Sequence, residues 1–145
     1  MKEFENVDFN GQTLAVILRS SYNKSGIKFF TPNNFSQQLG YMKHPKGYII
    51  VPHVHNPLTR EVRHTKEVLF IKSGKIRVDF YDDKKKYLES RILNKGDVIL
   101  LAFGGHGFEM LEPTEMIEVK QGPYSGEIDK SRFQTVDPDK LKVKN

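Results

Sequence analysis

The stretch Lys75-Ile76-Arg77-Val78-Asp79-Phe80-Tyr81 decides the fold class. Its isoleucine, valine and phenylalanine alternate with its arginine and aspartate, a period of two that places apolar and charged side chains on opposite faces of a β-strand. Further segments are rich in Ile, Val, Leu, Phe and Tyr and also predict strands. They cover residues 14–18, 48–55, 67–72, 86–93, 98–103 and 116–120.

Helical patterns are nearly absent from the chain. The best helical candidate, residues 34–39, is short. Many short strands separated by turn-forming residues are typical of a sandwich or barrel, whereas a parallel α/β fold needs helices between its strands. The sequence therefore predicts a single all-β domain over residues 1–136 and a polar, frayed tail over 137–145.

Composition limits the chemistry that the protein can use. The chain has 145 residues, 37% of them hydrophobic and 28% charged, which suits one globular domain. It contains no cysteine, so disulfides, zinc-thiolate sites, iron–sulfur clusters and cysteine nucleophiles are excluded. No apolar stretch of signal-peptide or membrane-helix type is visible, so we expect a cytoplasmic protein without a membrane partner.

The chain carries a basic excess. With 23 basic and 18 acidic residues its formal net charge is +5, which is compatible with nucleic acid, an acidic membrane surface or a small anion as partner. No helix-turn-helix, zinc finger or RNA-binding strand motif accompanies the charge. We therefore expect a small molecule and no nucleic acid.

Three histidines and one glutamate are spaced for a metal site. His53 and His55 are two residues apart on a predicted strand, so both rings project from one face. Glu67 opens the next predicted strand, and His106 follows another one. If the sheet closes into a small barrel, these side chains form a site of three nitrogens and one oxygen for one divalent ion of iron, manganese, nickel, cobalt or zinc. The alternative is that the histidines are separate surface or turn residues.

Two motifs in the chain resemble those of the cupin superfamily. The first motif is a glycine, a His-x-His triplet, a glutamate and a second glycine, found at Gly47, His53, His55, Glu67 and Gly74. The second motif is a glycine followed by a strand, a tight turn and a histidine, found at Gly96 and His106. The resemblance covers residues 47–110. It implies a single-domain jelly-roll barrel (double-stranded β-helix) that binds its metal through His53, His55, Glu67 and His106.

The chain departs from the family pattern between the two halves of the first motif. Eleven residues, 56–66, separate His55 from Glu67, where the family has about three or four. Glu61 and His64 within this insertion are therefore alternative ligands, although the spacing from Glu67 to the following glycine is the family's. The second motif lacks the family's proline, so its turn is remodelled.

The insertion also carries a basic cluster. Arg60, Arg63 and Lys66 are opposed by Glu61 alone. If the predicted ligands on either side face the metal, this loop emerges at the barrel mouth, where arginine forks match carboxylate or phosphate oxygens. Arg60, Arg63 and the aromatic Tyr48 are the predicted substrate-binding residues. An ordinary solvated hairpin explains the charges equally well.

Several functions fit this pattern. The favoured hypothesis is a metal-dependent enzyme acting on a small anionic or sugar-like molecule, with isomerase or epimerase chemistry in carbohydrate metabolism as the class that the cupin resemblance implies. His64 is the predicted catalytic acid or base, since imidazole titrates near neutrality. A non-haem dioxygenase and a non-catalytic ligand-binding cupin are the alternatives. We further expect a homodimer, for which residues 4–18 offer edge strands. Residues 121–133 lie either across the barrel mouth or at the dimer edge.

Overall fold

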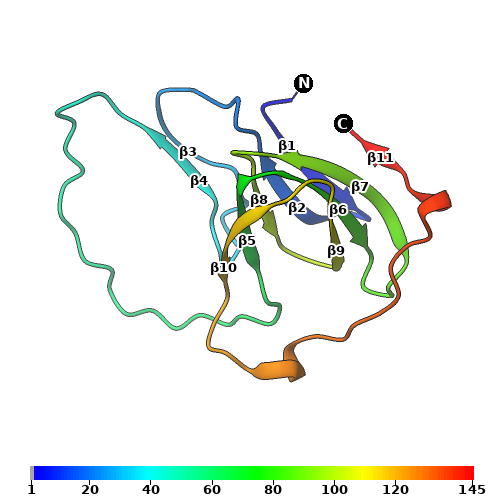
Figure 1. Ribbon diagram of the computed structural model, residues 1–145. Coiled ribbons are helices and arrows are strands. Elements are labelled where there is room, and N and C mark those ends of the chain that lie inside the picture. The colour runs from blue at the N-terminus through cyan, green and yellow to red at the C-terminus, as the bar shows by residue number, and fades with distance from the viewer. Residues whose placement is uncertain (1) are drawn as a thin grey trace. The chain divides into compact units, whose positions relative to one another are not determined.

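The computed structural model describes residues 2–145, and strands dominate it. Contacts divide the chain into two compact units, the first comprising Met1–Tyr22 and His64–Asn145 and the second Asn23–Arg63. The first unit holds two sheets (Figure 1). One has the order β1-β2-β8-β5-β10, with bounds Phe4–Phe9, Gln12–Leu18, Val98–Leu101, Glu67–Ser73 and Glu115–Lys120. The other has the order β11-β7-β6-β9, with bounds Val143–Lys144, Tyr87–Asn94, Lys75–Tyr81 and Gly105–Met110.

The alternation in β6 sets the core as the sequence predicts. Ile76, Val78 and Phe80 are buried on one face of this strand. They join a cluster that draws residues from both sheets, including Ile17 of β2 and Ile99 of β8. Contributions from both sheets mean that the apolar faces pack against each other, as in a β-sandwich. The all-β prediction is confirmed.

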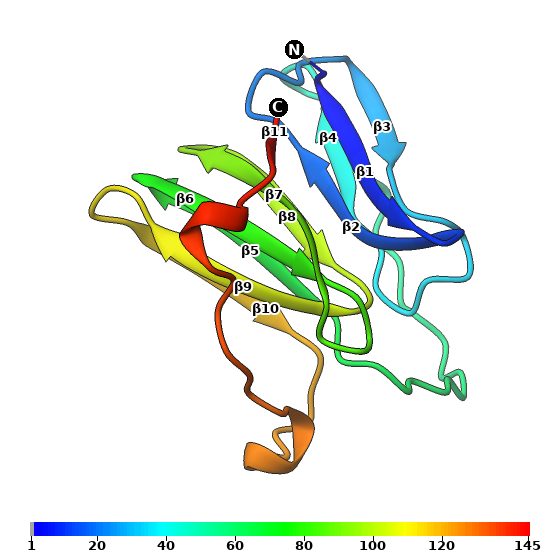
Figure 2. The same ribbon diagram turned by 90° about the vertical axis from the view of Figure 1, so that its right-hand side faces the viewer.

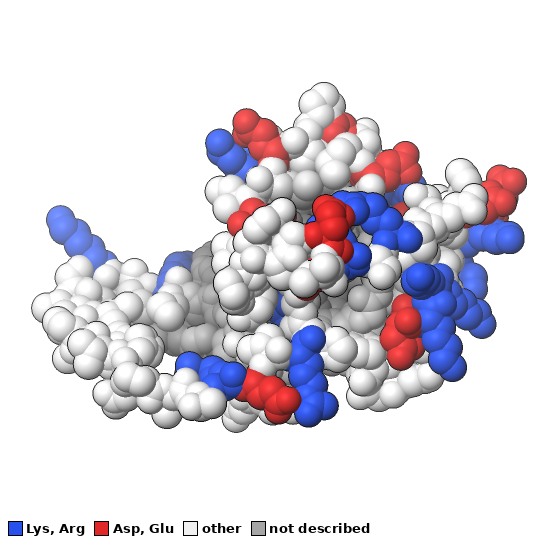
Figure 3. Space-filling model, turned by 90° about the horizontal axis from the view of Figure 1, so that it is seen from below, with Lys and Arg blue, Asp and Glu red and all other residues white. Residues whose placement is uncertain are grey.

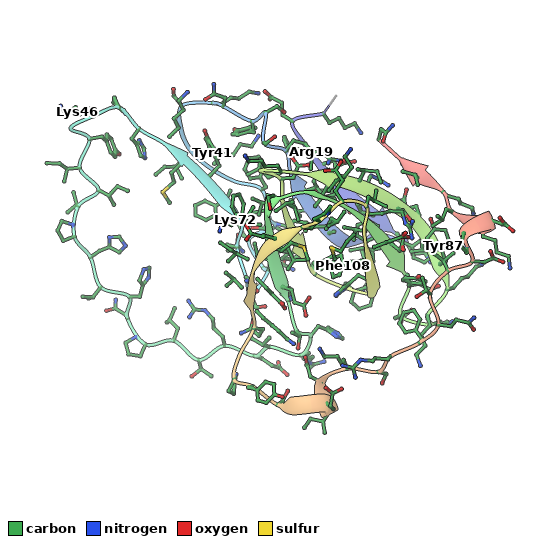
Figure 4. The ribbon with its side chains drawn as sticks, in the orientation of Figure 1. Arg19, Tyr41, Lys46, Lys72, Tyr87 and Phe108 are labelled. Carbon is green, nitrogen blue, oxygen red and sulfur yellow. The ribbon has the colours of Figure 1, made fainter. Side chains whose placement is uncertain are left out.

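A buried ion network fastens the two sheets together at one end. The Arg19 guanidinium donates to Glu5 of β1 at 2.7 Å and to Asp97 at 3.0 Å. Arg91 of β7 donates to the second oxygen of Glu5 at 3.0 Å. Arg19 is labelled in Figure 4. Because strands of different sheets share one carboxylate, the network fixes how the sheets meet at this end.

The structure differs from the sequence expectation in its topology. Over the described part of the chain neither sheet closes on itself, so no barrel is formed. The tail expected to fray from residue 137 instead forms the 3₁₀ helix η2, Pro138–Lys140, and the short strand β11, which pairs in parallel with β7. The Tyr87 hydroxyl accepts a hydrogen bond from the Lys142 amide at 2.8 Å and so holds this tail in place (Figure 4).

The expected helix at residues 34–39 is not formed. This segment consists of turns and bends. The Gln38 side chain donates to the backbone carbonyls of Pro32 and Phe35, both at 2.9 Å, and accepts a hydrogen bond from Thr31. Polar side chains that bond the local backbone compete with helix formation, so the segment becomes a compact loop.

The second unit contains a hairpin and a long irregular segment. Strands β3, Gly26–Phe29, and β4, Gly40–Lys43, pair antiparallel. Residues 46–63 carry neither helix nor strand, so the strand predicted over 48–55 is not formed. A strand needs a neighbour for its backbone hydrogen bonds, and its side-chain pattern alone does not supply one.

The described helices are the 3₁₀ turns η2 and η1, Gly126–Asp129. Among residues 2–145 no helix has the length and apolar character needed to cross a membrane.

Candidate active-site cavity

A cavity of about 740 Å³ opens within the first unit. Ligand sites for small molecules fall in the range of ~300–1,000 Å³, so this cavity has room for one. Its wall combines the start of β5, strand β9 and its preceding turn, and the segment that follows η1. The side chains important below are those of His64, Glu67, Asp79, Tyr81, His106 and Phe133.

Glu67 and His106 form the polar centre of this cavity. Glu67 lies on the core-facing side of β5, two and four residues before buried Leu69 and Ile71. His106 pairs in register with Phe80 and therefore faces the same interior. The two strands thus bring His106 Nε2 to 3.2 Å from a Glu67 carboxylate oxygen, with 28% and 16% of the side chains exposed.

The electrostatics of this pair favour an ionised carboxylate. The hydrogen bond from His106 holds the pKa of Glu67 below its usual range, although partial burial works in the opposite direction. Lys120 of β10 is paired in register with Glu67 and brings its Nζ to 3.9 Å from the other oxygen. An ionised carboxylate beside an imidazole nitrogen is suited to cation binding or to proton transfer.

His64 lines the same cavity. Its ring contacts the face of Phe103 edge-on, with centroids 5.4 Å apart. The predicted acid or base therefore shares a cavity with Glu67 and His106, as the proposed catalytic role requires.

Sequence reasoning missed a second polar group in the wall. Arg77 and Asp79 occupy the face of β6 turned away from the core, where the alternation suggested solvent. Both are buried instead, and Arg77 Nε donates to Asp79 at 2.8 Å. Arg77 also contacts a Glu109 oxygen at 2.6 Å. The residue pattern of β6 is the same whether its polar face is covered by another segment or faces water, so the sequence of this strand could not predict the burial.

The covering segment comes from the C-terminal part of the chain. In Figure 2 this segment, orange to red, passes in front of the four-stranded sheet on its way to β11. The Phe133 ring packs edge-on against Tyr81 at 4.9 Å between centroids, and the Val136 amide donates to the Tyr81 hydroxyl at 3.0 Å. Residues 129–135 form part of the cavity wall. The sequence left open whether this part of the chain lies across the mouth of the site or at a dimer edge. The structure places it at the cavity.

The cavity does not concentrate the basic excess of the chain. Its wall includes the acidic side chains of Glu67, Asp79, Glu109 and Asp129 and the basic side chains of Arg77, Lys130 and Arg132. Figure 3 likewise shows Lys and Arg side chains interspersed with Asp and Glu over one face of the molecule. The net charge of +5 is therefore not directed at this cavity.

The remaining predicted site residues belong to the second unit. His53 and His55 lie in the irregular segment with their ring centroids 5.2 Å apart, and His53 Nδ1 is 2.9 Å from the Val51 carbonyl oxygen. Tyr48 stacks on His44 at 3.9 Å between ring centroids.

The basic cluster of the insertion is solvated. Arg63 forms an ion pair with Glu61 at 3.0 Å, with about three-quarters of each side chain exposed, and Arg60 is exposed as well. These contacts are those of an ordinary surface loop, and they leave the arginines accessible to a ligand.

The donor set suits a metal only in part. Glu67 and His106 supply one oxygen and one nitrogen that face the same cavity. Within residues 2–145, no group of three or more His, Cys, Asp or Glu side chains is assembled in a way that could hold an ion. Of the four ligands that the motifs predict, Glu67 and His106 are therefore the two that meet in the first unit.

Comparison with known proteins finds no match: no family model, no curated protein and no solved structure is similar to this chain.

Proposed function

We propose that the protein is a metal-dependent enzyme of the cupin type that acts on a small sugar-like molecule. The observation that supports this most strongly is the Glu67–His106 pair, which faces a ligand-sized cavity from two different strands. His53 and His55, the further ligands that the cupin resemblance implies, lie in the second unit. Two sheets packed through their apolar faces are compatible with the jelly-roll arrangement that the cupin resemblance implies.

The composition of the cavity favours a polyhydroxylated ligand. Phe103, Phe108 and Phe133 offer apolar ring surface beside the carboxylates described above. Aromatic faces pack on the C–H surfaces of sugar rings, while carboxylates accept hydrogen bonds from hydroxyl groups. The carboxylates offset the cations of the wall, so a neutral sugar ring is a better match than a compact anion. Arg60 and Arg63 are the proposed contacts for an anionic substituent.

Each group of the site has a distinct proposed role. A bound divalent ion would supply Lewis-acid polarisation of a substrate carbonyl or hydroxyl oxygen. Glu67 is held ionised and accepts the hydrogen bond from His106, so it is prepared to act as an oxygen ligand. His64 takes up or delivers a proton within the cavity. The segment that carries Phe133 excludes water from one side of it.

Metal analysis with matched variants tests this proposal. We expect the purified wild type to contain about one divalent ion per chain, and His106→Ala and Glu67→Gln to lose most of it. Glu61→Gln is the control, because Glu61 is the alternative carboxylate in the insertion. Retention of metal by Glu67→Gln and loss by Glu61→Gln would move the ligand to Glu61, while unchanged metal in both His106→Ala and Glu67→Gln would disprove the site.

Turnover is assayed separately, by following sugar and sugar-phosphate isomerisation or epimerisation. His64→Gln should reduce turnover while the metal content stays at the wild-type value. Metal binding with no turnover on any of these substrates would contradict the isomerase or epimerase and favour the two alternatives, a dioxygenase or a ligand-binding cupin.

A further inference from the structure

We propose that residues 121–135, called the cover segment below, open and close over the cavity as a hinged unit and so control access to it. The segment joins β10 to the C-terminal residues that reach β7, and Figure 1 draws it in orange below the two sheets of the first unit. Its residues 129–135 form part of the cavity wall. The proposal concerns access to the cavity, and it depends neither on the metal nor on the chemistry proposed above.

The cover segment has little packing of its own. Within the described chain none of its residues is buried, and none belongs to the core cluster of the first unit. Even the Phe133 side chain, whose ring packs against Tyr81, is 37% exposed. Segments with few buried apolar contacts open locally, without unfolding of the rest of the protein. The cover segment can therefore move while the two sheets stay folded.

Strands hold both ends of the cover segment. At one end Lys120 is the last residue of β10, which pairs with β5. Beyond the other end, the Ser90 amide of β7 donates to the Lys142 carbonyl oxygen at 2.9 Å, and Lys144 forms an ion pair with Glu89 at 2.7 Å. A weakly packed stretch between two anchored ends moves about those ends as hinges. Opening therefore leaves the C-terminal residues paired with β7.

A missing side chain on β9 makes a seat for the closed cover segment. Gly105 is paired in register with Tyr81. A Cβ added at Gly105 would lie 2.9 Å from Phe133 Cζ and 3.2 Å from Tyr81 Cβ, which is too close for the ring to stay where it is. The φ angle of Gly105 lies outside the left-handed region, so the backbone there does not itself require glycine. The absence of a side chain at this position therefore serves the seating of Phe133.

A second contact links the cover segment to the polar centre of the cavity. Asp129 accepts a hydrogen bond from the Thr65 hydroxyl and lies 3.7 Å from Lys120 Nζ. The same Nζ is 3.9 Å from a Glu67 carboxylate oxygen. Lys120 is thus shared between the cover segment and the carboxylate that faces the cavity. Closure therefore changes the charges that a molecule in the cavity meets, as well as the path by which it enters.

Nitration of tyrosine by tetranitromethane measures the opening. Tyr81 is 4% exposed beneath Phe133, whereas Tyr124 in the cover segment is 94% exposed and serves as the internal reference. The chain has no cysteine, so the reagent meets no competing thiol. Peptide mass spectrometry gives the rate at each tyrosine, and the ratio of the two rates reports how often Tyr81 is uncovered.

We expect Tyr81 to be nitrated more slowly than Tyr124, at a rate that does not change with urea below the unfolding transition. A local opening exposes little surface, so urea does not promote it, whereas global unfolding responds steeply. A Tyr81 rate that rises with urea as steeply as global unfolding would mean that the cover segment is a fixed wall. A Tyr81 rate equal to that of Tyr124 would mean that nothing covers it. Either result would overturn the proposal.

Asp129→Ala tests whether the cover segment moves as a unit. The substitution removes the contacts with Thr65 and Lys120 at a point that does not touch Tyr81. Losing these contacts should raise the nitration rate of Tyr81 about fivefold, because the closed position is weakened as a whole. An unchanged Tyr81 rate in this variant would show that Phe133 moves alone, and it would overturn the hinged cover.

Gly105→Ala tests the seat, with Gly107→Ala as the matched control on the same face of β9. The new Cβ at Gly105 should displace Phe133 and raise the nitration rate of Tyr81 about tenfold. A Cβ at Gly107 meets nothing closer than Tyr81 Cε2 at 3.9 Å, so its rate should stay within about twofold of wild type. Equal increases in the two variants would overturn the seat. If Gly105→Ala does not fold, the Asp129→Ala result decides the proposal.

Discussion

Replacing Glu5 by glutamine should destabilise the first unit markedly. Glu5 is 9% exposed and accepts hydrogen bonds from Arg19 and Arg91 at 2.7 and 3.0 Å. Breaking a buried ion pair by removing one partner costs ~3–5 kcal/mol, because the remaining charge is left uncompensated. Here Arg19 keeps Asp97 at 3.0 Å and Arg91 keeps Glu89 at 2.9 Å, which places the loss at the lower end. We therefore expect a loss of about 3 kcal/mol in the free energy of unfolding.

Urea denaturation measures this loss. The midpoint should fall while the dependence of the free energy on urea concentration is unchanged, since the exposed surface on unfolding is the same. The control is Glu112→Gln, which removes a half-exposed ion pair with Lys75 at 3.0 Å and should cost at most about 1 kcal/mol. A loss from Glu5→Gln no larger than that of the control would refute the role of the network.

The stability difference between wild type and Glu5→Gln should also depend on pH. Burial raises the pKa of Glu5, but the hydrogen bonds from Arg19 and Arg91 outweigh it and hold the pKa below its usual value of 4.5. A carboxyl group with a lowered pKa in the folded state contributes stability above its unfolded pKa, and this contribution is lost as the pH falls through the folded value. The stability difference between wild type and Glu5→Gln should therefore be full at neutral pH and shrink below pH 4.5. A difference that stays constant into strong acid would contradict this reasoning.

Four further substitutions, one of them a control, test other parts of the first unit. Tyr81→Phe removes the hydroxyl that accepts a backbone hydrogen bond from the C-terminal segment, so limited proteolysis within residues 126–142 should become faster, with about 1 kcal/mol lost. Gly74→Ala should cost ~1–3 kcal/mol in urea titrations, because φ is +87° and the new Cβ would meet a carbonyl oxygen at 2.3 Å. Gly11→Ala, at φ +76° with open space, should cost less. Phe80→Ala, in the centre of the core, should cost ~3–5 kcal/mol by thermal unfolding.

Several strands of the first unit follow directly from local sequence, whereas β9 and β11 were not predicted. Alternation in residues 75–81 identifies both the strand β6 and its buried face, because one apolar face in a two-sheet protein has only the other sheet to pack against. The prediction for residues 67–72 is confirmed by β5 in the same way. In these two segments the pattern of side chains is enough to predict the strand from the sequence alone.

The polar half of the cavity could not be predicted for a physical reason. Arg77 and Asp79 have the alternation of a solvated strand face, yet both are buried, and a segment more than fifty residues later in the chain packs on the neighbouring Tyr81. Phe133, which covers Tyr81, is an ordinary aromatic residue in a turn-rich stretch. Whether a polar face is covered is a property of the whole fold, and periodicity within one strand carries no information about it.

Glu67 and His106, which motif spacing predicted as ligands, line one cavity together with His64 of the insertion. The side-chain pattern predicted a strand over residues 48–55 that is not formed, because a strand needs a neighbouring strand for its backbone hydrogen bonds. The core cluster consists entirely of residues from the first unit. The fold of this unit can therefore form from its own side chains.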